Sequence, residues 1–372
     1  MTNLNFNKPK IGFLISGGGT GGHIFPAIAI AEELKKRFVD CRIHFVGAKG
    51  KMEMSKIPQA GYEIDGLWIS GIQRSLTLKN LLFPVKILSS LWNARKIIRK
   101  FKPDVVIGTG GYASGPTLRM AQSMGLPTLV QEQNSFPGIT NKWLASRVNA
   151  ICVAYENMEK YFPKEKIRIT GNPIRNQVVQ IEGKHDSACK FFDLKEEKLT
   201  VLLVGGSQGA LSINKNIEQI IDIFEQLDIQ FIWQTGVSYY EQAVNLTKDK
   251  SHIKVYDFIY EMDKAYAAAD IVLSRAGAIA ISEICAVAKP SIFIPLPTAA
   301  EDHQTKNALA LVEKDAAVLV NDKAPSGELS REIKRLVGDE ELRNQLSVNM
   351  AKLAVLNSAS LIVDEIEKLI KA

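Results

Sequence analysis

The sequence predicts an α/β protein with two Rossmann-like domains, whose parallel sheets face a central cleft. First, its 372 residues suffice for two domains of ordinary size. Second, short apolar runs alternate with helical segments, which is typical of parallel strands joined by crossover helices. Third, a strand, a glycine loop and a helix follow one another twice, starting near residue 11 and again near residue 200.

The first domain is expected at residues 1–170. After the first strand and its glycines, a helix is predicted from about Phe25 to Phe38. The strands of this domain are predicted in the short apolar runs at 11–16, 42–46, 104–108, 128–131 and 150–154.

The second domain is expected at 171–350, because Gly and Pro end a strand near Gly171–Asn176. Apolar residues at helical spacing from Leu353 to Ile370 predict a C-terminal helix at 351–372 that packs back on the first domain. In sheets of this kind, ligands bind beyond the carboxyl ends of the strands, which places the site in the cleft. The strands of the second domain are predicted at 200–204, 230–234, 253–256, 271–274, 291–295 and 317–320.

The overall composition excludes several classes of protein. Apolar residues make up 46% and charged residues 23%, so disorder and collagen-like structure are excluded. The four cysteines include no CxxC pair, which excludes a disulfide framework and a cysteine-rich zinc site. Neither HExxH nor Asp-x-Asp occurs, so no metal site is predicted. Without a secretory signal or an apolar stretch of about 20 residues, we expect a cytosolic protein or one attached to a membrane surface.

The formal net charge of +6 is unevenly distributed. Residues 1–170 contain 24 Lys and Arg against 11 Asp and Glu, whereas residues 171–372 contain 22 against 29. The first half is therefore basic and the second acidic. A basic half indicates an anionic partner such as nucleic acid, phosphates or a lipid surface, and an uneven solvated surface explains it equally well.

A glycine loop, Gly17–Gly22, lies between the first predicted strand and the first helix. Glycines let the backbone approach a ligand, and a helix start offers free N–H groups to an anion. The loop is neither a P-loop nor a complete dinucleotide fingerprint. His23 follows the loop at the start of the helix, which disfavours the imidazolium form. The neutral imidazole that remains can act as a base or donate a hydrogen bond. Tight strand–helix packing and a capping histidine are the structural alternatives.

Three polar segments follow predicted strands of the second domain. Gly205–Ala210 offers backbone donors and a hydroxyl to phosphate or sugar oxygens. Gly277 precedes a helix start suited to a diphosphate, and Glu283 in that helix suits two ribose hydroxyls. The polar run at 301–307 suits sugar recognition. The structural alternatives to these roles are that Glu283 stabilises its own helix and that Asp302 caps a helix.

The first domain has two further polar segments after strands, the loop at 108–116 and Gln131–Asn134. Glu132 is a candidate base, and a structural carboxylate is the alternative. Between residues 76 and 92, apolar residues alternate with lysines and end in Trp92, a pattern typical of segments that lie in a membrane interface. A core helix after a loop explains the same pattern.

Seven motifs stand in order along the chain: GGGTGGHIFPAIAIAEEL (17–34), KPDVVIGTGGYASGP (102–116), QEQNSFPGITNKWLA (131–145), GNPIR (171–175), VGGSQGA (204–210), SRAGAIAISE (274–283) and DHQTKNA (302–308). Together they resemble the MurG family of peptidoglycan N-acetylglucosaminyltransferases, which have the GT-B fold. The resemblance fits the whole length of the chain.

The resemblance implies that N-acetylglucosamine passes from UDP-N-acetylglucosamine (UDP-GlcNAc) to the C4 hydroxyl of the muramoyl sugar of lipid I. The link formed is β-1,4 with inversion, and the products are lipid II and UDP. The sequence itself indicates no required cofactor and contains no metal-binding motif. The resemblance also implies peripheral attachment at the cytoplasmic face of the bacterial inner membrane, on an anionic lipid surface, and contacts with other cell-wall and division proteins. Nucleic acid is not an expected partner.

The resemblance also assigns residues. The base is assigned by residue type and placement instead, with His23 as the first candidate and Glu132 as the second. The positions that match donor contacts are Thr20, Gly21, Gly22, Asn134, Arg175, Ser207, Ile259, Ala278, Ile279, Ala280, Ile281, Ser282, Glu283, His303, Gln304 and Asn307. The acceptor-side positions are Gly18, Gly19, Gly110, Gly111 and Tyr112, and those of the membrane region are Lys79, Leu81, Leu82, Phe83, Lys86 and Trp92.

Within the donor set, Glu283 is expected to bind the ribose hydroxyls, and Ser207 with a helix start the diphosphate. The backbone of Ile259 is expected to bind uracil. The sugar is expected to contact His303, Gln304 and Asn307. Ala280 departs from the family, whose members usually carry Thr there, and the segment 298–300 also differs.

Three alternatives remain open. A nicotinamide dehydrogenase uses similar glycine loops, but the acid that binds its ribose is missing here. A non-hydrolysing UDP-GlcNAc 2-epimerase shares the two-domain layout and needs no basic amphipathic segment. A non-enzymatic nucleotide-binding membrane adaptor is excluded if UDP is released when an acceptor is added.

Overall fold

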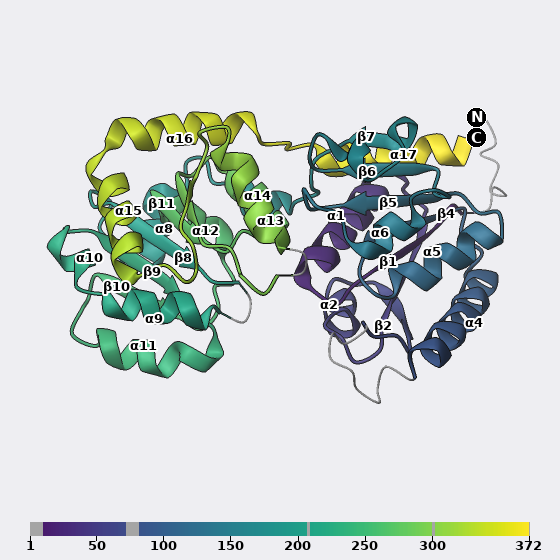
Figure 1. The fold of residues 1–372 in the computed structure, drawn as a ribbon, viewed down its shortest axis with the longest axis horizontal. Coiled ribbons are helices and arrows are strands. Elements are labelled where there is room, and N and C mark those ends of the chain that lie inside the picture. The colour runs from purple at the N-terminus through teal and green to yellow at the C-terminus, as the bar shows by residue number, and fades with distance from the viewer. Residues whose placement is uncertain (1–9, 72–81, 207–208, 300–301, 372) are drawn as a thin grey trace, which may run out of the picture. The chain divides into compact units, whose positions relative to one another are not determined.

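The computed structural model describes residues 10–71, 82–206, 209–299 and 302–371 (Figure 1). The chain divides into unit 1, comprising Met1–Ile174 and Asn357–Ala372, and unit 2, comprising Arg175–Leu356. Unit 1 therefore extends to residue 174 rather than to 170, and it also contains the C-terminal helix α17 (Ser358–Lys371). The C-terminal helix expected at 351–372 begins seven residues later, at Ser358.

The described residues of unit 1 form a seven-stranded parallel sheet in the order β3-β2-β1-β4-β5-β6-β7. The strands are β1 (Gly12–Gly17), β2 (Arg42–Ala48), β3 (Glu63–Leu67), β4 (Val105–Gly110), β5 (Thr128–Glu132), β6 (Ala150–Val153) and β7 (Ile167–Ile169). The helices are α1 (Gly21–Arg37), α2 (Glu53–Gln59), α4 (Phe83–Phe101), α5 (Ser114–Ser123), α6 (Ile139–Leu144) and α17, with the 3-10 turns η1 (Met158–Lys160) and η2 (Lys164–Lys166).

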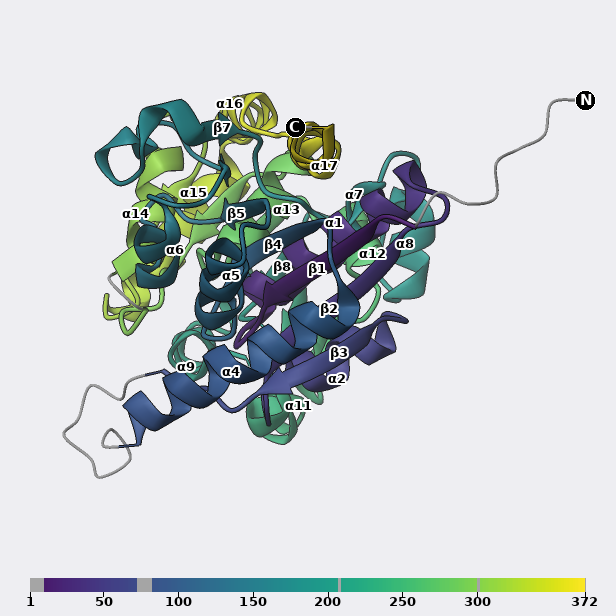
Figure 2. The same cartoon turned by 90° about the vertical axis from the view of Figure 1, so that its right-hand side faces the viewer.

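Helices cover both faces of this sheet, because alternate residues of β1 point to opposite sides. Phe13 and Ile15 pack with α1 and α17 in one buried cluster. Leu14 packs with α4 and α5 in the other (Figure 2). Arg37 fixes α17 to α1 through an ion pair with Asp364. A sheet that is buried on both faces explains why the central strands read as continuous apolar runs.

The described residues of unit 2 form a six-stranded parallel sheet in the order β10-β9-β8-β11-β12-β13. The strands are β8 (Thr200–Val204), β9 (Gln230–Gln234), β10 (Ile253–Tyr256), β11 (Ile271–Ser274), β12 (Ser291–Phe293) and β13 (Val318–Leu319). The helices are α7 (Asn176–Val179), α8 (His185–Phe191), α9 (Leu211–Gln219), α10 (Ile223–Gln226), α11 (Tyr240–Thr247), α12 (Met262–Ala268), α13 (Ala278–Ala286), α14 (His303–Val312), α15 (Ser326–Gly338) and α16 (Glu340–Lys352), with the turn η3 (Val237–Tyr239).

In unit 2 the same alternation fills two cores. Leu202 packs with α8, α12 and α13, whereas Val201 and Leu203 pack with α9, α10 and α15. The predicted fold class, two α/β units with parallel sheets, is therefore confirmed, together with all eleven predicted strands.

Two strands and one helix start differ from the prediction. The sequence analysis missed β3 and β7, because edge strands carry charged residues and lack a continuous apolar run. Helix α1 begins at Gly21, four residues before the predicted start at Phe25. Glycines are poor helix formers, and here packing overrides that local preference.

Candidate active site

The glycine loop after β1 packs against the loop after β4. A Cβ atom on Gly111 would lie 2.2 Å from the carbonyl oxygen of Gly18, and one on Gly110 would lie 2.8 Å from the His23 ring. Gly110 and Gly111 also have φ angles of 96° and 87°, which side chains rarely allow. Packing therefore requires these glycines. Tyr112, the next residue, keeps 48% of its surface exposed.

Glu53, to which the sequence analysis gave no role, holds the first loop. Its carboxylate is fully buried and accepts the N–H of Gly19 at 2.8 Å and that of Ala48 at 2.9 Å. The N–H of Gly18 donates to the carbonyl of Gly110 at 3.3 Å. The N–H groups of Gly18 and Gly19 are thus bound within unit 1.

The remaining donors of this loop lie at the start of α1. Thr20 is the N-cap residue, and its side chain makes no capping hydrogen bond. Within the part of the chain that the structure describes, the N–H groups of Gly21 and Gly22 donate to no acceptor. A Cβ atom on Gly22 would meet nothing closer than the Thr20 hydroxyl, at 3.6 Å. Unpaired N–H groups at a helix start are suited to bind an anion.

His23 lies in the first turn of α1, and its ring is held through Nδ1. The carbonyl oxygen of Thr109 lies 2.9 Å from Nδ1, and Oε1 of Gln133 lies 3.0 Å from it. Because both neighbours are acceptors, we assign the ring proton to Nδ1. Nε2 then carries the lone pair, and it meets no hydrogen-bond partner among the described residues. This arrangement leaves Nε2 able to accept a proton.

Glu132 is surrounded by donors instead. Its Oε1 accepts the N–H of Asn134 at 3.0 Å and the side-chain amide of Asn134 at 3.1 Å. Its Oε2 accepts the N–H of Gly138 at 3.1 Å and the side-chain amide of Asn141 at 2.9 Å. The residue is 2% exposed. These four hydrogen bonds favour the structural alternative for Glu132 and leave His23 as the stronger candidate base.

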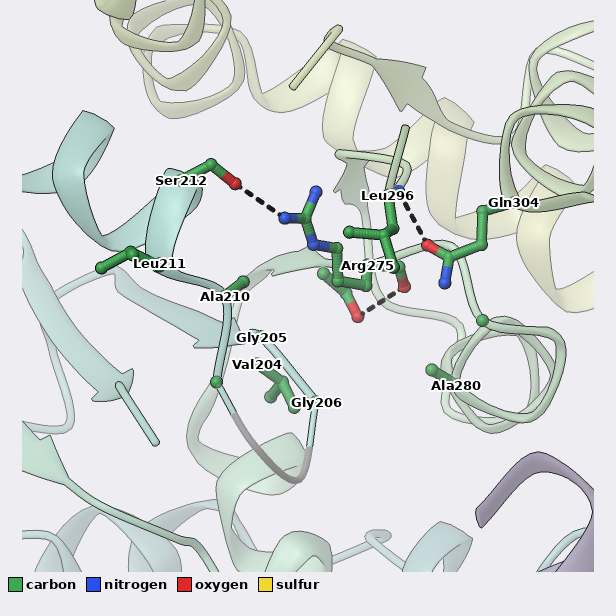
Figure 3. Close-up of a pocket in the computed structure, with 13 residues that line it drawn as sticks. Val204, Gly205, Gly206, Ala210, Leu211, Ser212, Arg275, Ala280, Leu296 and Gln304 are labelled. Atoms are coloured by element: carbon green, nitrogen blue, oxygen red, sulfur yellow. Dashed lines mark hydrogen bonds between the residues drawn. The ribbon is translucent and has the colours of Figure 1, made fainter. Parts of the chain in front are cut away.

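A pocket of about 450 Å³ opens in unit 2, a size within the range of small-molecule sites. It lies at the carboxyl ends of β8 and β11, where sheets of this kind bind ligands. Its lining includes residues at the starts of three helices, α9, α13 and α14 (Figure 3). The lining residues are Val204, Gly205, Gly206, Gly209, Ala210, Leu211, Ser212, Ser274, Arg275, Gly277, Ala280, Leu296 and Gln304.

The wall of this pocket contains a buried cation, Arg275, which is 9% exposed. Its guanidinium forms an ion pair with Asp322 and donates to the Ser212 hydroxyl at 2.8 Å (Figure 3). It also donates to the carbonyl oxygens of Ile294 and Pro295, at 3.0 and 3.1 Å. The Ser212 hydroxyl in turn donates to Asp322 at 2.7 Å. Arg275 thereby joins the end of β12 to the start of α9.

Of the expected sugar contacts, Gln304 is the one that lines the pocket. Its Oε1 accepts the N–H of Leu296 at 2.9 Å, which fixes the side chain beside the opening (Figure 3). Asn307 is fully buried, and its amide lies 3.5 Å from the carbonyl of Ala276. His303, the first residue of α14, is half-buried and does not belong to the described lining.

In the helix run from Ala278 to Glu283, only Ala280 belongs to the described lining. A Thr at this position would carry a hydroxyl on the carbon that is the methyl group of Ala280. Glu283 is 5% exposed, and burial raises the pKa of its carboxyl even though Arg175 favours the charged form. Its Oε1 accepts from Arg175 at 3.0 and 3.3 Å, and Tyr266 donates a further hydrogen bond.

Other expected positions fall in different surroundings. Ile259 is 3% exposed, and its N–H donates to Oε1 of Gln234 at 3.0 Å. That N–H group is therefore already paired within unit 2. The Ser282 hydroxyl donates to the carbonyl of Ala278 at 2.9 Å. Ser207, Lys79 and Leu81 lie outside the described residues.

Helix α4 exposes an apolar stripe rather than burying it. The helix buries Ser90, Ala94 and Ile98, whereas Leu88 and Trp92 are 68% and 66% exposed. The stripe consists of Leu82, Val85, Leu88 and Trp92. Phe83 is half-buried, and Lys86 lies 5.7 Å from the Trp68 ring, while Lys96 lies 5.9 Å from the Trp92 ring. An exposed stripe with cations beside it favours the interfacial alternative over the core helix.

The sequence analysis missed the residues that hold the site side chains. It gave no role to Glu53, Thr109, Gln133 or Asp322, and it quoted Arg275 without assigning it one. A charged residue directly after an apolar strand was the signal for Arg275. For Asp322, which lies 47 residues later, no local signal exists.

In the described ranges, no helix is both long and apolar enough to cross a bilayer, and no three metal-ligating side chains gather around one point.

Family models match most of the chain. The description of one is glycosyltransferase family 28 N-terminal domain, matched at residues 13–153. The description of the other is glycosyltransferase family 28 C-terminal domain, matched at residues 200–365.

Curated relatives match nearly end to end. A protein of Flavobacterium psychrophilum is 51% identical over 97% of this chain and 98% of its own length. One of Parabacteroides distasonis is 53% identical over 97% of this chain and 99% of its own. Both are named UDP-N-acetylglucosamine--N-acetylmuramyl-(pentapeptide) pyrophosphoryl-undecaprenol N-acetylglucosamine transferase.

Among solved structures, MurG of Acinetobacter baumannii matches with a TM-score of 0.77 and 28% identity, over 97% of this chain and all of the other. A UDP-GlcNAc 2-epimerase of Neisseria meningitidis matches with a TM-score of 0.68 and 14% identity, over 97% of this chain and all of the other. The second likeness shows the fold alone.

Proposed function

This chain belongs to glycosyltransferase family 28, and on that premise we propose that it transfers N-acetylglucosamine from UDP-GlcNAc to the muramoyl C4 hydroxyl of lipid I. The products are lipid II and UDP. The observation that carries the proposal is the pocket of unit 2, which opens at the starts of three helices. Helix starts favour negative charge, and a nucleoside diphosphate brings that charge.

The donor fits the pocket group by group. The diphosphate binds at the starts of α9 and α13, whose N–H groups stabilise the charge that develops as UDP leaves. Gln304, fixed by Leu296, offers its amide nitrogen to a sugar hydroxyl. Glu283 remains our ligand for the ribose hydroxyls, with Arg175 and Tyr266 holding its carboxylate.

Unit 1 supplies the candidate base and two further donors. The N–H groups of Gly21 and Gly22, which match donor-contact positions, bind an anionic group of UDP-GlcNAc. Nε2 of His23 takes the proton of the C4 hydroxyl as that oxygen attacks the anomeric carbon. The bond from this carbon to the diphosphate oxygen breaks on the opposite face, which inverts the centre to the β-1,4 link. To act as the base, Nε2 of His23 must lie within hydrogen-bond distance of the C4 hydroxyl.

UDP release tests this function. Purified protein with UDP-GlcNAc and a lipid I analogue is expected to release UDP, and omission of the analogue should abolish the release. UDP-N-acetylgalactosamine serves as the matched donor that differs at one hydroxyl, and it should react far more slowly. UDP-sugar epimerisation without an acceptor would instead favour the epimerase alternative, and no UDP release in any mixture would contradict the proposal.

For attachment to the membrane, we take the α4 stripe as the contact with an anionic lipid surface, at the cytoplasmic face of the inner membrane. Leu88 and Trp92 are its most exposed members, and Arg95, Lys96 and Arg99 lie beside them on the same helix. Apolar insertion and attraction to anionic headgroups act together in such segments.

A charge placed in the stripe should weaken this binding. The double variant Leu88→Glu/Trp92→Glu is expected to bind phosphatidylglycerol vesicles at least about tenfold less than wild type, as measured by sedimentation. Val348, which is 55% exposed on α16, provides the matched control Val348→Glu, which should bind like wild type. Equal losses in both variants, or no loss in the α4 variant, would show that α4 is not the contact.

A further inference from the structure

Gln133 lies beside the proposed base and has no role in the function described so far. We infer that Gln133 is a positioning residue that fixes the ring of His23, an inference that rests on the proposed role of His23 as base. Oε1 of Gln133 lies 3.0 Å from Nδ1 of His23, and the side chain is 1% exposed. A buried amide at this distance limits both the rotation of the ring and the site of its proton.

The orientation of the Gln133 amide is fixed by its other neighbours. Its Nε2 donates to the carbonyl oxygens of Thr109 and Gln131, at 2.9 and 3.2 Å, and also to Oε1 of the Gln131 side chain. A flipped amide would place Oε1 against these three oxygens and Nε2 against the Nδ1 proton. The assignment of Oε1 to His23 therefore follows from the hydrogen-bond network.

A second layer of amides holds Gln131 and Gln133 in turn. Nε2 of Gln131 donates to Oδ1 of Asn172 at 3.0 Å, and Nδ2 of Asn172 donates to the backbone carbonyl of Gln133 at 3.1 Å. All three side chains are at most 3% exposed. A network of buried amides whose donors are satisfied is rigid, so it holds His23 in one arrangement.

The catalytic consequence concerns the tautomer. The acceptors Thr109 and Gln133 stabilise the ring with its proton on Nδ1, and only that tautomer presents a lone pair at Nε2. When Gln133 is lost, the Thr109 carbonyl still accepts the Nδ1 proton, so this tautomer keeps part of its stabilisation. We expect kcat to fall about tenfold in Gln133→Met, while the Kd for UDP-GlcNAc stays within about twofold.

A double-mutant cycle separates positioning from support of the fold. Gln133→Met should lower kcat about tenfold in wild type and no more than about twofold in a His23→Ala background, because the group that it positions is then absent. Gln133→Glu restores an oxygen acceptor at Nδ1 but cannot donate to Thr109, so it should recover most of the turnover while unfolding at a lower temperature than wild type. Equal losses in both backgrounds, or a Glu variant no faster than Met, would overturn the inference.

A matched control and a direct measurement complete the test. Gln230 is also buried, and its amide contacts the backbone N–H of Lys195 and the hydroxyl of Thr200, the first residue of β8. Gln230→Met should therefore lower the unfolding temperature without lowering kcat. The 15N spectrum of the wild-type histidines requires no variant of Gln133. It should show the His23 resonance, identified by its loss in His23→Ala, with the proton on Nδ1, and a proton on Nε2 would overturn the inference.

Failure of the inference and failure of the proposed function give different results. If His23→Ala turns over normally, the base assignment fails, and the role of Gln133 fails with it. If His23→Ala is slow but Gln133→Met is normal, only the positioning role fails. If wild-type protein releases no UDP with the lipid I analogue, the proposed reaction itself fails.

Discussion

Replacing His23 by alanine is expected to lower kcat about 10²- to 10⁴-fold, the range typical of a lost general base. The expectation rests on the hydrogen bonds of Nδ1 to Thr109 and Gln133, which leave Nε2 with the lone pair. The ring does not line the unit 2 pocket described above, so UDP-GlcNAc should bind with an unchanged Kd.

His23→Asn is the sharper variant. Its side-chain amide can donate to Thr109 as Nδ1 does, but it has no basic nitrogen at the Nε2 position. It should therefore fold like wild type and be as slow as the alanine variant. Turnover is measured by UDP release and donor binding by calorimetry. Near-normal turnover in both variants with unchanged donor binding would show that His23 is not the base.

The second large effect is expected at Arg275, in the wall of the unit 2 pocket. Arg275→Met leaves the carboxylate of Asp322 without its cation, and the side chain of Asp322 is only 9% exposed. Removing one partner of a buried ion pair typically costs about 3–5 kcal/mol. We therefore expect the unfolding transition of unit 2 to fall by roughly 10 °C, as measured by calorimetry.

Two further variants test the cause. Arg275→Lys keeps the charge, but an ammonium group lacks the fork that reaches Asp322, Ser212 and the two carbonyl groups together, so it should recover only part of the loss. Adding Asp322→Asn to Arg275→Met removes the unpaired charge, and the double variant should be more stable than the sum of the single effects predicts.

An ion pair whose cation is exposed, and whose buried carboxylate Glu332 keeps a second partner in Arg335, provides the control for Arg275. Arg331 contacts Glu332, and its side chain is 69% exposed, so Arg331→Met should change stability by no more than about 1 kcal/mol. If Arg275→Met were equally mild, the Arg275 cluster would not be the support that the structure indicates.

The strands and the central helices could be predicted from the sequence because their signals are local. Runs such as 201–204 are apolar throughout, since both faces of the sheet are covered. The edge strands β3 and β7 have no such cover, so Glu63, Asp65 and Arg168 interrupt their pattern. The start of α1 at Gly21 could not be predicted, because its first turn is held by His23 against Thr109, 86 residues away.

The site was predicted as a set of segments rather than as an arrangement of groups. The pocket is lined by the glycine loop at 205–210 and by Gly277, where backbone donors and a helix start were expected. The sequence left the role of Glu132 open between a base and a structural carboxylate, and four hydrogen bonds favour the second. The hydrogen bond from the Gly19 N–H to Glu53 could likewise not be predicted from the sequence.

By itself, the sequence determined the two parallel-sheet units, the loops that follow their strands and the resemblance to a glycosyltransferase family. The units and loops depend on the spacing of apolar residues and glycines within short segments, and the resemblance depends on seven short motifs. Only the tertiary structure decided which groups remain available within those loops. His23 and Gln133 are 110 residues apart, and Arg275 and Asp322 are 47 apart. Such pairs form only when the folded sheet brings the ends of non-neighbouring strands, β1 with β5 and β11 with β13, to the same edge. Packing, and not local pattern, therefore determines which polar atoms are left to meet a substrate.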